Sequence, residues 1–464
     1  MSDRRRTVIV LACCLGAGFG TLLDSAATTY AVPSLQQSLG ATTQQVQWFL
    51  ASYSLTFGLG LVPAGRLGDR LGRKAPLLFG LALFLGGGLL SVFAAQIWWS
   101  VAGRIVQGFG GGTISAQVLG LIQDEFEGMA RLRALSGYGM ASAASALAGP
   151  LLSALVLQTL PADWSWRVIL GLNIPFITAT LLVTLLYHPL PRDGQLAQTT
   201  RRLGLDLPAV ALLGVLVTVI TLPVVDPVLS DYSLWLMLVV PLLVAVLVWW
   251  ERRCLAAGRL PLFVPALVRS RGFVIGCVVA MFWFGAILAK STVLTLYLLE
   301  HAALTPLWVA TLFIPGALAR IWASAQGTRA FRRFGAHAVP LALGVELAAA
   351  ALLLVATLGT PSTARLIWVT VAFSVVSGLG SGITEPVLRA VTFAHAPAQA
   401  RGVAASFFQL VQRLSATFFV ALATGLLLAG GELGLTFGVI AGGAGTLVAA
   451  ALSLDRTYRV QPAR

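Results

Sequence analysis

Fourteen apolar stretches, each about twenty residues long, dominate the sequence and limit what the chain can fold into. A helix needs about 20 apolar residues to cross the hydrocarbon core of a bilayer. Only 10% of the 464 residues are charged and 58% are hydrophobic, which leaves too little charge for the surface of a water-soluble protein. The sequence therefore predicts an all-α integral membrane protein with 14 transmembrane helices. The stretches lie near residues 8–32, 46–64, 75–95, 98–122, 134–157, 167–187, 206–225, 232–250, 272–299, 305–326, 337–358, 366–388, 402–428 and 433–453.

Lysine and arginine concentrate in every second connection between the predicted helices. If the N-terminus is cytoplasmic, the inner segments hold 25 of the 31 cations, and the outer loops hold only Arg167 and Arg365. Cytoplasmic loops of membrane proteins carry such an excess of Lys and Arg. The pattern predicts that both termini are cytoplasmic. It also accounts for the net charge of +14, so nucleic acid is not an expected partner.

The composition also bears on the source and the surroundings of the protein. Only Lys74 and Lys290 are lysines, and Ala, Gly, Leu and Val abound, as in chains encoded by GC-rich bacterial genomes. We therefore expect a multi-pass protein of a bacterial inner (plasma) membrane. Its expected partners are the lipid bilayer, a small-molecule substrate and protons. We expect it to function as a monomer.

Two segments of the first half recur in the second half. QGFGGGTISAQVL (107–119) matches SGLGSGITEPVL (377–388) in three alternating glycines, and GRLGDRLGRK (65–74) has a diverged counterpart in TRAFRRFGAH (328–337). Both matches shift the helix number by eight. A six-helix unit (1–188), two additional linker helices with cytoplasmic loops (189–271) and a second six-helix unit (272–464) explain that shift. Repeated halves around a central cavity are a design of membrane transporters.

The same residues carry a resemblance to a known family. GRLGDRLGRK resembles the signature between helices 2 and 3 of the major facilitator superfamily, and RIVQGFGGG (104–112) resembles its helix 4 motif. AGPLLS (148–153), with Gly149 and Pro150, is similar to the helix 5 antiporter motif. LLDSAATTYAVP (22–33) and WSWRVILGLNIP (164–175) resemble the fourteen-helix drug:proton antiporter branch. The resemblance implies two six-helix bundles around a midplane cavity, with transport coupled to proton movement.

Asp24 and Arg104 are the clearest charges within predicted helices. Asp24 lies about 24 Å along the first helix from the inner face, and Arg104 about 9 Å along the fourth from the outer face, at 1.5 Å per residue. In a core about 30 Å thick the two therefore lie at similar depth. We hypothesise that Asp24 takes up a proton or receives a cationic substrate, with Arg104 as its counter-charge. The alternative is a fixed structural ion pair.

Other polar residues within the predicted helices are candidates for the same cavity. Glu346 and Glu385 either serve proton coupling or substrate binding, or make structural hydrogen bonds. Gln117, Lys290 and Arg413 are further candidates for lining the cavity. The second-half cations leave room for an anionic or lipid-like substrate, although they can equally pair with the two glutamates.

The decapeptide GRLGDRLGRK contains two kinds of residue. Its cations, Arg70 and Arg73 among them, place the loop on the cytoplasmic side. Gly65, Asp69 and Gly72 instead favour close backbone approach and a carboxylate that meets a helix N-terminus or an arginine. By resemblance, this contact holds the outward-facing state closed on the inner side. The start of the thirteenth helix, near Gly402, is the expected partner.

The predicted function is secondary active transport. The leading hypothesis is a proton-coupled exporter (antiporter) of amphipathic or hydrophobic small molecules that works by alternating access. A rival is a dedicated exporter of one natural product or of a lipid-like or anionic compound. A proton-coupled uptake symporter and an intramembrane enzyme are more distant alternatives. We expect neither an enzyme activity, a metal site nor a cofactor other than the proton gradient.

Overall fold

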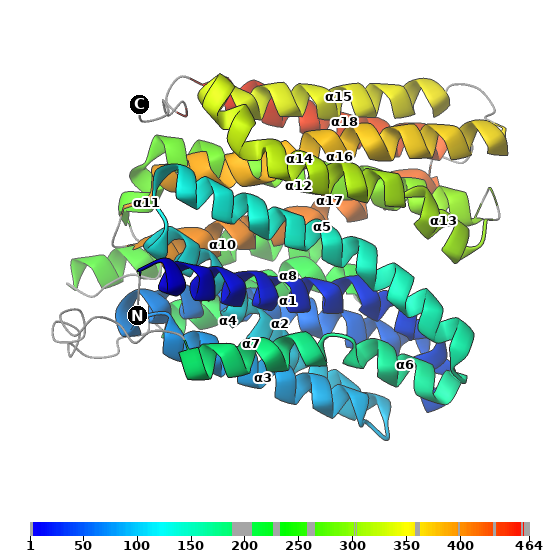
Figure 1. Cartoon of the computed structure of the whole chain (residues 1–464), viewed down its shortest axis with the longest axis horizontal. Coiled ribbons are helices and arrows are strands. Elements are labelled where there is room, and N and C mark those ends of the chain that lie inside the picture. Colours follow the sequence, from blue (N-terminus) through cyan, green and yellow to red (C-terminus); the bar gives the residue numbers. More distant parts are fainter. Residues whose placement is uncertain are drawn as a thin grey trace. The chain divides into compact units, whose positions relative to one another are not determined.

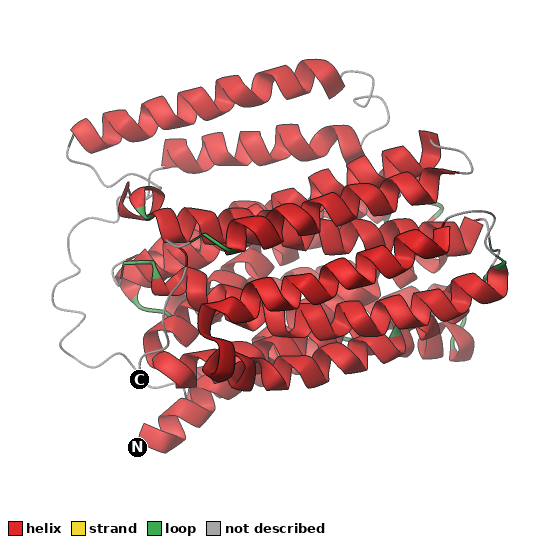
Figure 2. Cartoon of the chain, turned by 90° about the horizontal axis from the view of Figure 1, so that it is seen from above, coloured by secondary structure: helices red, strands yellow, loops and turns green. Residues whose placement is uncertain are grey.

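The computed structural model describes residues 3–187, 207–225, 233–257, 265–300, 302, 304–357, 362–397, 400–429, 433–455 and 458. Within these ranges every regular element is a helix (Figures 1 and 2). The first half contains α1 (Asp3–Leu39), α2 (Thr43–Leu71), α3 (Lys74–Val92), α4 (Ile97–Glu125), α5 (Gly128–Thr159), α6 (Ala162–Gly171) and α7 (Ile174–Tyr187). They are followed by α8 (Leu207–Val225), α10 (Ser233–Ala256) and the short α11 (Pro265–Arg269).

The second half contains the remaining helices. They are α12 (Arg271–Glu300), α13 (Pro306–Leu312), α14 (Ile314–Phe334), the 3-10 turn η2 (Gly335–His337), α15 (Ala338–Thr357), α16 (Thr363–Ala394), α17 (Arg401–Ala429) and α18 (Gly434–Ser453). Ten segments of the described residues are long and apolar enough to cross a membrane, and one of them, Leu307–Thr357, runs from α13 through α15. The chain is therefore an all-helical protein with at least ten such segments, whereas the count of fourteen crossings stays a prediction.

Two of the predicted spans are broken helices. The sixth, expected over 167–187, is divided into α6 and α7 at Leu172 and Asn173, and the tenth, expected over 305–326, is divided into α13 and α14 at Phe313. In both places a proline, Pro175 or Pro315, stands in the first turn of the second helix. Proline has no N–H and disfavours helical backbone in the residue before it. Each break therefore follows from the local sequence.

The chain divides into two compact units. Unit 1 comprises Met1–Phe126, Ala148–Arg269 and Pro397–Leu410, and unit 2 comprises Glu127–Leu147, Ser270–Ala396 and Val411–Arg464. The helices α5 and α17 each contribute residues to both units, because α5 changes unit at Ala148 and α17 at Val411. The domain boundaries expected at 188 and 271 stay a prediction.

Alternating glycines bring the central helices of each unit into backbone contact. In unit 1, a Cβ atom at Gly108 or Gly112 of α4 would overlap the backbone of α2. In unit 2, a Cβ atom at Gly378 or Gly382 of α16 would overlap the backbone of α14. Residues four apart lie on one face of a helix. The equal contacts of the two segments support the internal repeat.

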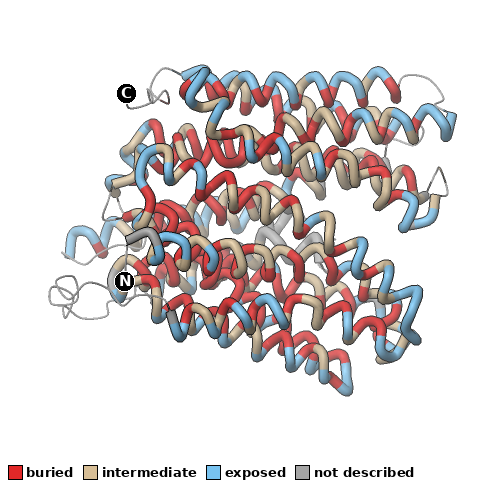
Figure 3. The backbone as a smooth tube through the Cα atoms, viewed as in Figure 1, coloured by how far each residue is buried: buried red, intermediate tan, exposed pale blue. Residues whose placement is uncertain are grey.

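The middle glycine of each segment faces the helix on the other side, which is α3 for α4 and α15 for α16. A Cβ atom at Gly110 would lie 2.6 Å from the Phe84 nitrogen of α3, and one at Gly380 would lie 3.0 Å from the Ala342 oxygen of α15. Figure 1 shows α15, α16 and α18 side by side. Along α15, buried and exposed residues alternate (Figure 3), so that only one side faces its neighbours. Glycine therefore fixes which helices flank α4 and α16.

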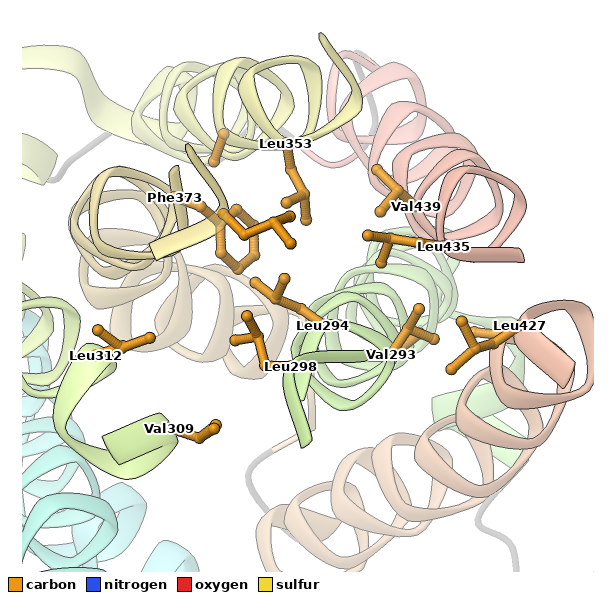
Figure 4. Packing of buried hydrophobic residues seen from close by; sticks show 14 of the residues in the cluster. Val293, Leu294, Leu298, Val309, Leu312, Leu353, Phe373, Leu427, Leu435 and Val439 are labelled. Carbon is orange, nitrogen blue, oxygen red and sulfur yellow. The ribbon is translucent and has the colours of Figure 1, made fainter. Parts of the chain in front are cut away.

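Apolar clusters fill the space between these helices. In unit 2, Leu294 and Leu298 of α12 lie near Leu353 of α15 and Phe373 of α16 (Figure 4). In unit 1, Leu35 of α1, Phe49 of α2 and Trp166 of α6 belong to one buried cluster. Dense packing of this kind tolerates little change in volume.

We predict that Gly112→Ala destabilises the protein, because the new methyl group would overlap the carbonyl oxygen of Phe57. Overpacking of this kind costs about 1–3 kcal/mol. The matched control is Gly86→Ala in α3, where an added Cβ meets nothing within 4 Å. That variant should keep or slightly raise the stability, since alanine favours helix over glycine. Thermal unfolding of the purified variants tests this, and equal transition temperatures would contradict it.

Candidate functional site

A buried carboxylate lies at the centre of a polar cluster in unit 1. Asp24 of α1 is 2% exposed, and its Oδ2 accepts a hydrogen bond from Arg104 Nη1 of α4 at 2.7 Å. Its Oδ1 accepts from Gln107 Nε2 at 3.1 Å and from Asn173 Nδ2 at 2.9 Å. Three donors, two from α4 and one from the break between α6 and α7, thus surround one carboxylate. The expected neighbourhood of Asp24 and Arg104 is confirmed, while their role in proton coupling stays a prediction.

Arg104 is held by aromatic side chains as well as by Asp24. Its guanidinium carbon lies 4.1 Å from the ring centroid of Tyr53 and 5.5 Å from that of Phe49. A guanidinium over an aromatic face gains about 0.5–2 kcal/mol, most when it is removed from water. Arginine does not lose its proton in proteins. The Arg104 guanidinium is therefore a positive charge held between a carboxylate and two aromatic rings.

A second buried pair lies in unit 2. Lys290 of α12 and Glu346 of α15 are both 0% exposed, and Lys290 Nζ lies 3.8 Å from Glu346 Oε2. Lys290 Nζ donates to Thr446 Oγ1 at 3.0 Å, and Ser377 Oγ donates to Glu346 Oε2 at 2.9 Å. Glu346 Oε1 is buried and has no hydrogen-bond partner among the described residues. Two of the predicted cavity residues therefore form a pair with incomplete hydrogen bonding.

A third group of charged residues, also in unit 2, has a net positive charge. Glu385 of α16 accepts from Arg320 of α14 at 2.6 Å and lies 2.8 Å from Arg389 Nη2, one turn further along α16. The Arg389 guanidinium carbon lies 5.2 Å from the ring centroid of Tyr138. The predicted twelfth span ended at residue 388, whereas α16 continues to Ala394 and buries Arg389. The spacing of four residues between Glu385 and Arg389 could have indicated this pair.

The carboxylate of Asp69 meets both kinds of partner that the decapeptide predicts. Its Oδ1 accepts from the Gly402 amide at 2.9 Å and its Oδ2 from the Val403 amide at 3.1 Å, at the first turn of α17. Arg73 bonds to Asp69 and also donates from Nε to Asp124 Oδ2 of α4 at 2.7 Å. The partner expected near Gly402 is thus confirmed. We call this group, with Gly65 and Gly402, the α2–α17 contact.

The electrostatics of this contact depend on its donors. Asp69 lies beyond the predicted span that ends at residue 64. Burial raises the pKa of its carboxyl above the ordinary value, and the Arg73 guanidinium and the two backbone amides oppose that rise. Helix N-termini carry a partial positive charge that favours an anion. The first turn of α17 and Arg73 therefore both stabilise the carboxylate in its charged form.

Glycines give the α2–α17 contact its close fit. A Cβ atom at Gly65 would lie 2.6 Å from the Gly402 oxygen, and one at Gly402 would lie 2.6 Å from Asp69 Oδ1. Gly72 follows the end of α2 with φ of +82°, a conformation that side chains disfavour. Its repeat counterpart, Gly335, has φ of +57° after α14. The decapeptide also contains Arg70, which belongs to α2 and whose side chain lies outside the described part of the structure.

The remaining predicted residues have structural contacts. Gln117 Nε2 donates to the Ala64 oxygen at 2.6 Å, which joins α4 to α2. A Cβ atom at Gly149 would lie 2.7 Å from the Ala26 Cβ, so that α5 approaches α1 closely, and Pro150 follows within α5. Arg413 lies on α17 and is half-buried. Whether these residues line a transport cavity stays a prediction.

Asn173 belongs to the Asp24 cluster but was not among the predicted site residues. It lies between α6 and α7, and its Nδ2 also donates to the Leu170 oxygen at 2.9 Å. A neutral amide carries no charge signal in an apolar span. The one sequence signal for it is its place in WSWRVILGLNIP, two residues before Pro175.

Comparisons with known proteins agree on one family. The profile of the Major Facilitator Superfamily matches residues 14–420. The chain is 28% identical over 411 residues to the probable actinorhodin transporter of Streptomyces coelicolor, an alignment that covers 88% of this chain and 70% of that protein. It is 30% identical over 341 residues to the drug efflux pump JefA of Mycobacterium tuberculosis. That alignment covers 72% of this chain and 64% of JefA, just under two thirds of its length.

Solved structures give the same fold. The proton:xylose symporter XylE bound to 6-bromo-6-deoxy-D-glucose matches with a TM-score of 0.69 at 14% identity, over 97% of this chain and 95% of that one. At this identity the likeness concerns the fold alone.

We predict that Asp69→Asn loosens the α2–α17 contact. The asparagine side chain has one acceptor oxygen in place of two and no charge for Arg73. A hydrogen bond to a charged group contributes about 1.5–3 kcal/mol, so the equilibrium should shift by about tenfold or more toward separation. Distances between spin labels on the last turn of α2 and the first turn of α17 measure this. Asp163→Asn, at an exposed site on α6, is the control. An unchanged distance distribution would contradict this role of Asp69 and leave the decapeptide only the role of orienting the loop in the membrane.

Proposed function

This chain belongs to the major facilitator superfamily, and we propose that it is a proton-coupled exporter of amphipathic small molecules. It is a multi-pass membrane transporter rather than an enzyme, as its relatives are. The relatives named above are a probable transporter of one antibiotic and a drug efflux pump, which supports export as the direction of transport. We further propose fourteen membrane crossings with both termini cytoplasmic, in a bacterial inner membrane, and a monomer that needs no cofactor.

The buried Asp24 cluster is the observation that most supports the proposal of proton coupling. A charge within the membrane costs at least about 2.5–3.5 kcal/mol and is retained mainly where it has a function or a partner. Asp24 has a permanent counter-charge in Arg104 and neutral donors in Gln107 and Asn173. When Asp24 takes up a proton, Arg104 loses its counter-charge, and Asn173 and Gln107 lose a charged acceptor. Protonation therefore changes the contacts among α1, α4 and the α6–α7 break.

The α2–α17 contact supplies a conformational element for alternating access. Its residues come from α2, α4 and the first turns of α17, whose later residues belong to unit 2. The helix α17 therefore connects this contact covalently to unit 2. We propose that forming the contact favours the outward-facing state, and that breaking it accompanies the opening of the inner side.

The two candidate functions, export of a cationic compound and export of an anionic one, differ in the charge of the substrate. The Arg320–Glu385–Arg389 group favours the second one, export of an anionic compound, because it combines two guanidinium groups with one carboxylate. Nε and Nη1 of Arg389 are buried and have no hydrogen-bond partner among the described residues. Such donors suit a carboxylate or a similar anion. Asp24 instead favours a cationic compound that competes with the proton.

We predict that Asp24→Asn strongly reduces accumulation driven by a pH gradient, because asparagine binds no proton. Purified protein in proteoliposomes is tested with one lipophilic cation and one anionic amphiphile. The variant should lose gradient-driven accumulation by about 5- to 150-fold, the range of ordinary coupling between two sites. Exchange of labelled for unlabelled substrate should persist, and Asp24→Glu should keep part of the coupling.

The same assay separates the two candidate functions. Faster transport of the cation supports the first, and faster transport of the anion, lost in Arg389→Gln, supports the second. Full gradient-driven accumulation by Asp24→Asn would contradict the role of Asp24.

A further inference from the structure

The Lys290–Glu346 pair is a second buried titratable group that the proposed mechanism leaves unused. The two residues lie on α12 and α15, within unit 2, and neither is exposed. A buried ion pair contributes little to stability unless its geometry and its other hydrogen bonds are good. At 3.8 Å, with one carboxylate oxygen unpartnered among the described residues, this pair has neither. Stabilisation of the fold therefore does not explain why this pair is present.

The hydrogen bonds of Glu346 differ from those of Asp24 in a way that favours proton uptake. Asp24 accepts three hydrogen bonds, one of them from a guanidinium. Among the described residues, Glu346 accepts one, from the Ser377 hydroxyl, and its Oε1 has no hydrogen-bond partner. The environment of Glu346 therefore holds the carboxylate less firmly than that of Asp24.

The internal repeat shows that a carboxylate is not required for packing at this place. Gly110 of α4 faces Phe84 of α3, and the corresponding Gly380 of α16 faces Glu346 of α15. A Cβ atom at Gly380 would lie 2.8 Å from Glu346 Cγ, so the glycine makes room for this side chain. Gly442 of α18 leaves similar room for Lys290, since a Cβ atom there would reach its Cγ. The first half fills the equivalent position with an apolar ring, whereas the second half holds a charged group in a fitted space.

The charges around Glu346 are few. Lys290 of α12 and Arg320 of α14 are the described cations whose charge acts on it. From α16 it meets the neutral Ser377, and on α18 the neutral Thr446 bonds to Lys290. Glu385 already compensates Arg320 directly. No other described carboxylate pairs with Lys290. Proton uptake by Glu346 thus changes the charge of one isolated pair.

We propose that Glu346 is a proton-binding site of the transporter, distinct from Asp24, and that Lys290 controls its affinity for the proton. The Glu346 carboxylate and a proton form the carboxylic acid, and Lys290 remains an ammonium group that bonds to Thr446. The charge of the pair changes from zero to plus one, and the electrostatic attraction between Lys290 of α12 and Glu346 of α15 is lost. Release of the proton restores it. This inference rests on the proposed function, because it supplies a second proton-binding carboxylate for the same transport cycle.

Infrared difference spectroscopy of the purified protein in lipid bilayers tests the proposal without any substrate. Acidification should produce a carboxylic acid C=O stretching band from a buried group in the wild type. The part of the band that Glu346 contributes should be absent in Glu346→Gln and present in Asp24→Asn, where the contribution of Asp24 is absent instead. In Ser377→Ala, which removes the one hydrogen bond to the carboxylate, the band should appear at a pH higher by about one unit or more.

Three results would overturn the proposal. They are no such band in the wild type over the pH range in which the protein stays folded, an unchanged band in Glu346→Gln, and an unchanged midpoint in Ser377→Ala. If Glu346→Gln alone does not fold, Lys290→Met/Glu346→Gln removes both charges together, and the Glu346 part of the band must again be absent. Because no transport is measured, a failure of the export proposal leaves this test valid. A failure of this test likewise leaves export by way of Asp24 open.

Discussion

A charged side chain within an apolar helical unit must find a partner on another helix, and the structure of both units depends on this constraint. In unit 1 the carboxylate of Asp24 brings α1 to Arg104 of α4 and to Asn173 at the break after α6. In unit 2 the charges of α12, α14, α15 and α16 pair across helices. Apolar contacts are not directional. The polar contacts, together with the close glycine contacts, therefore specify which helix faces which.

Glycine makes these polar contacts geometrically possible. Because Gly108 and Gly112 let α4 approach α2, and Gly110 lets it approach α3, α4 is buried at every position from Gly110 to Gln123. Arg104 and Gln107 lie on this central helix one or two turns earlier. In unit 2, α16 has the same relation to α14 and α15, and it carries Ser377, Glu385 and Arg389. Each unit thus carries part of its polar cluster on one glycine-lined central helix.

Much of this arrangement could be predicted from the sequence. The depths of Asp24 and Arg104 predicted their neighbourhood, and the decapeptide predicted the contact between Asp69 and the start of α17. Charges in apolar spans and a glycine-rich charged loop are strong signals, because each is costly or rare without a reason. The repeat was visible because three alternating glycines occur in both halves.

The partners that complete each cluster could not be predicted in the same way. Asn173, Ser377 and Thr446 are neutral and small, and such residues are common in membrane helices without any functional role. That Glu346 Oε1 has no hydrogen-bond partner among the described residues is a property of packing rather than of sequence. Which charges share a unit also follows from tertiary contacts, since α5 and α17 each contribute to both units.

Proton movement caused by substrate is the most direct test of the account. Proteoliposomes that contain the purified protein and an internal pH indicator receive a substrate gradient, with no pH gradient imposed at the start. The account predicts that protons move opposite to the substrate, and that their direction reverses when the substrate gradient is reversed. Substrate transport with no accompanying proton movement, or with protons moving in the same direction, would contradict it.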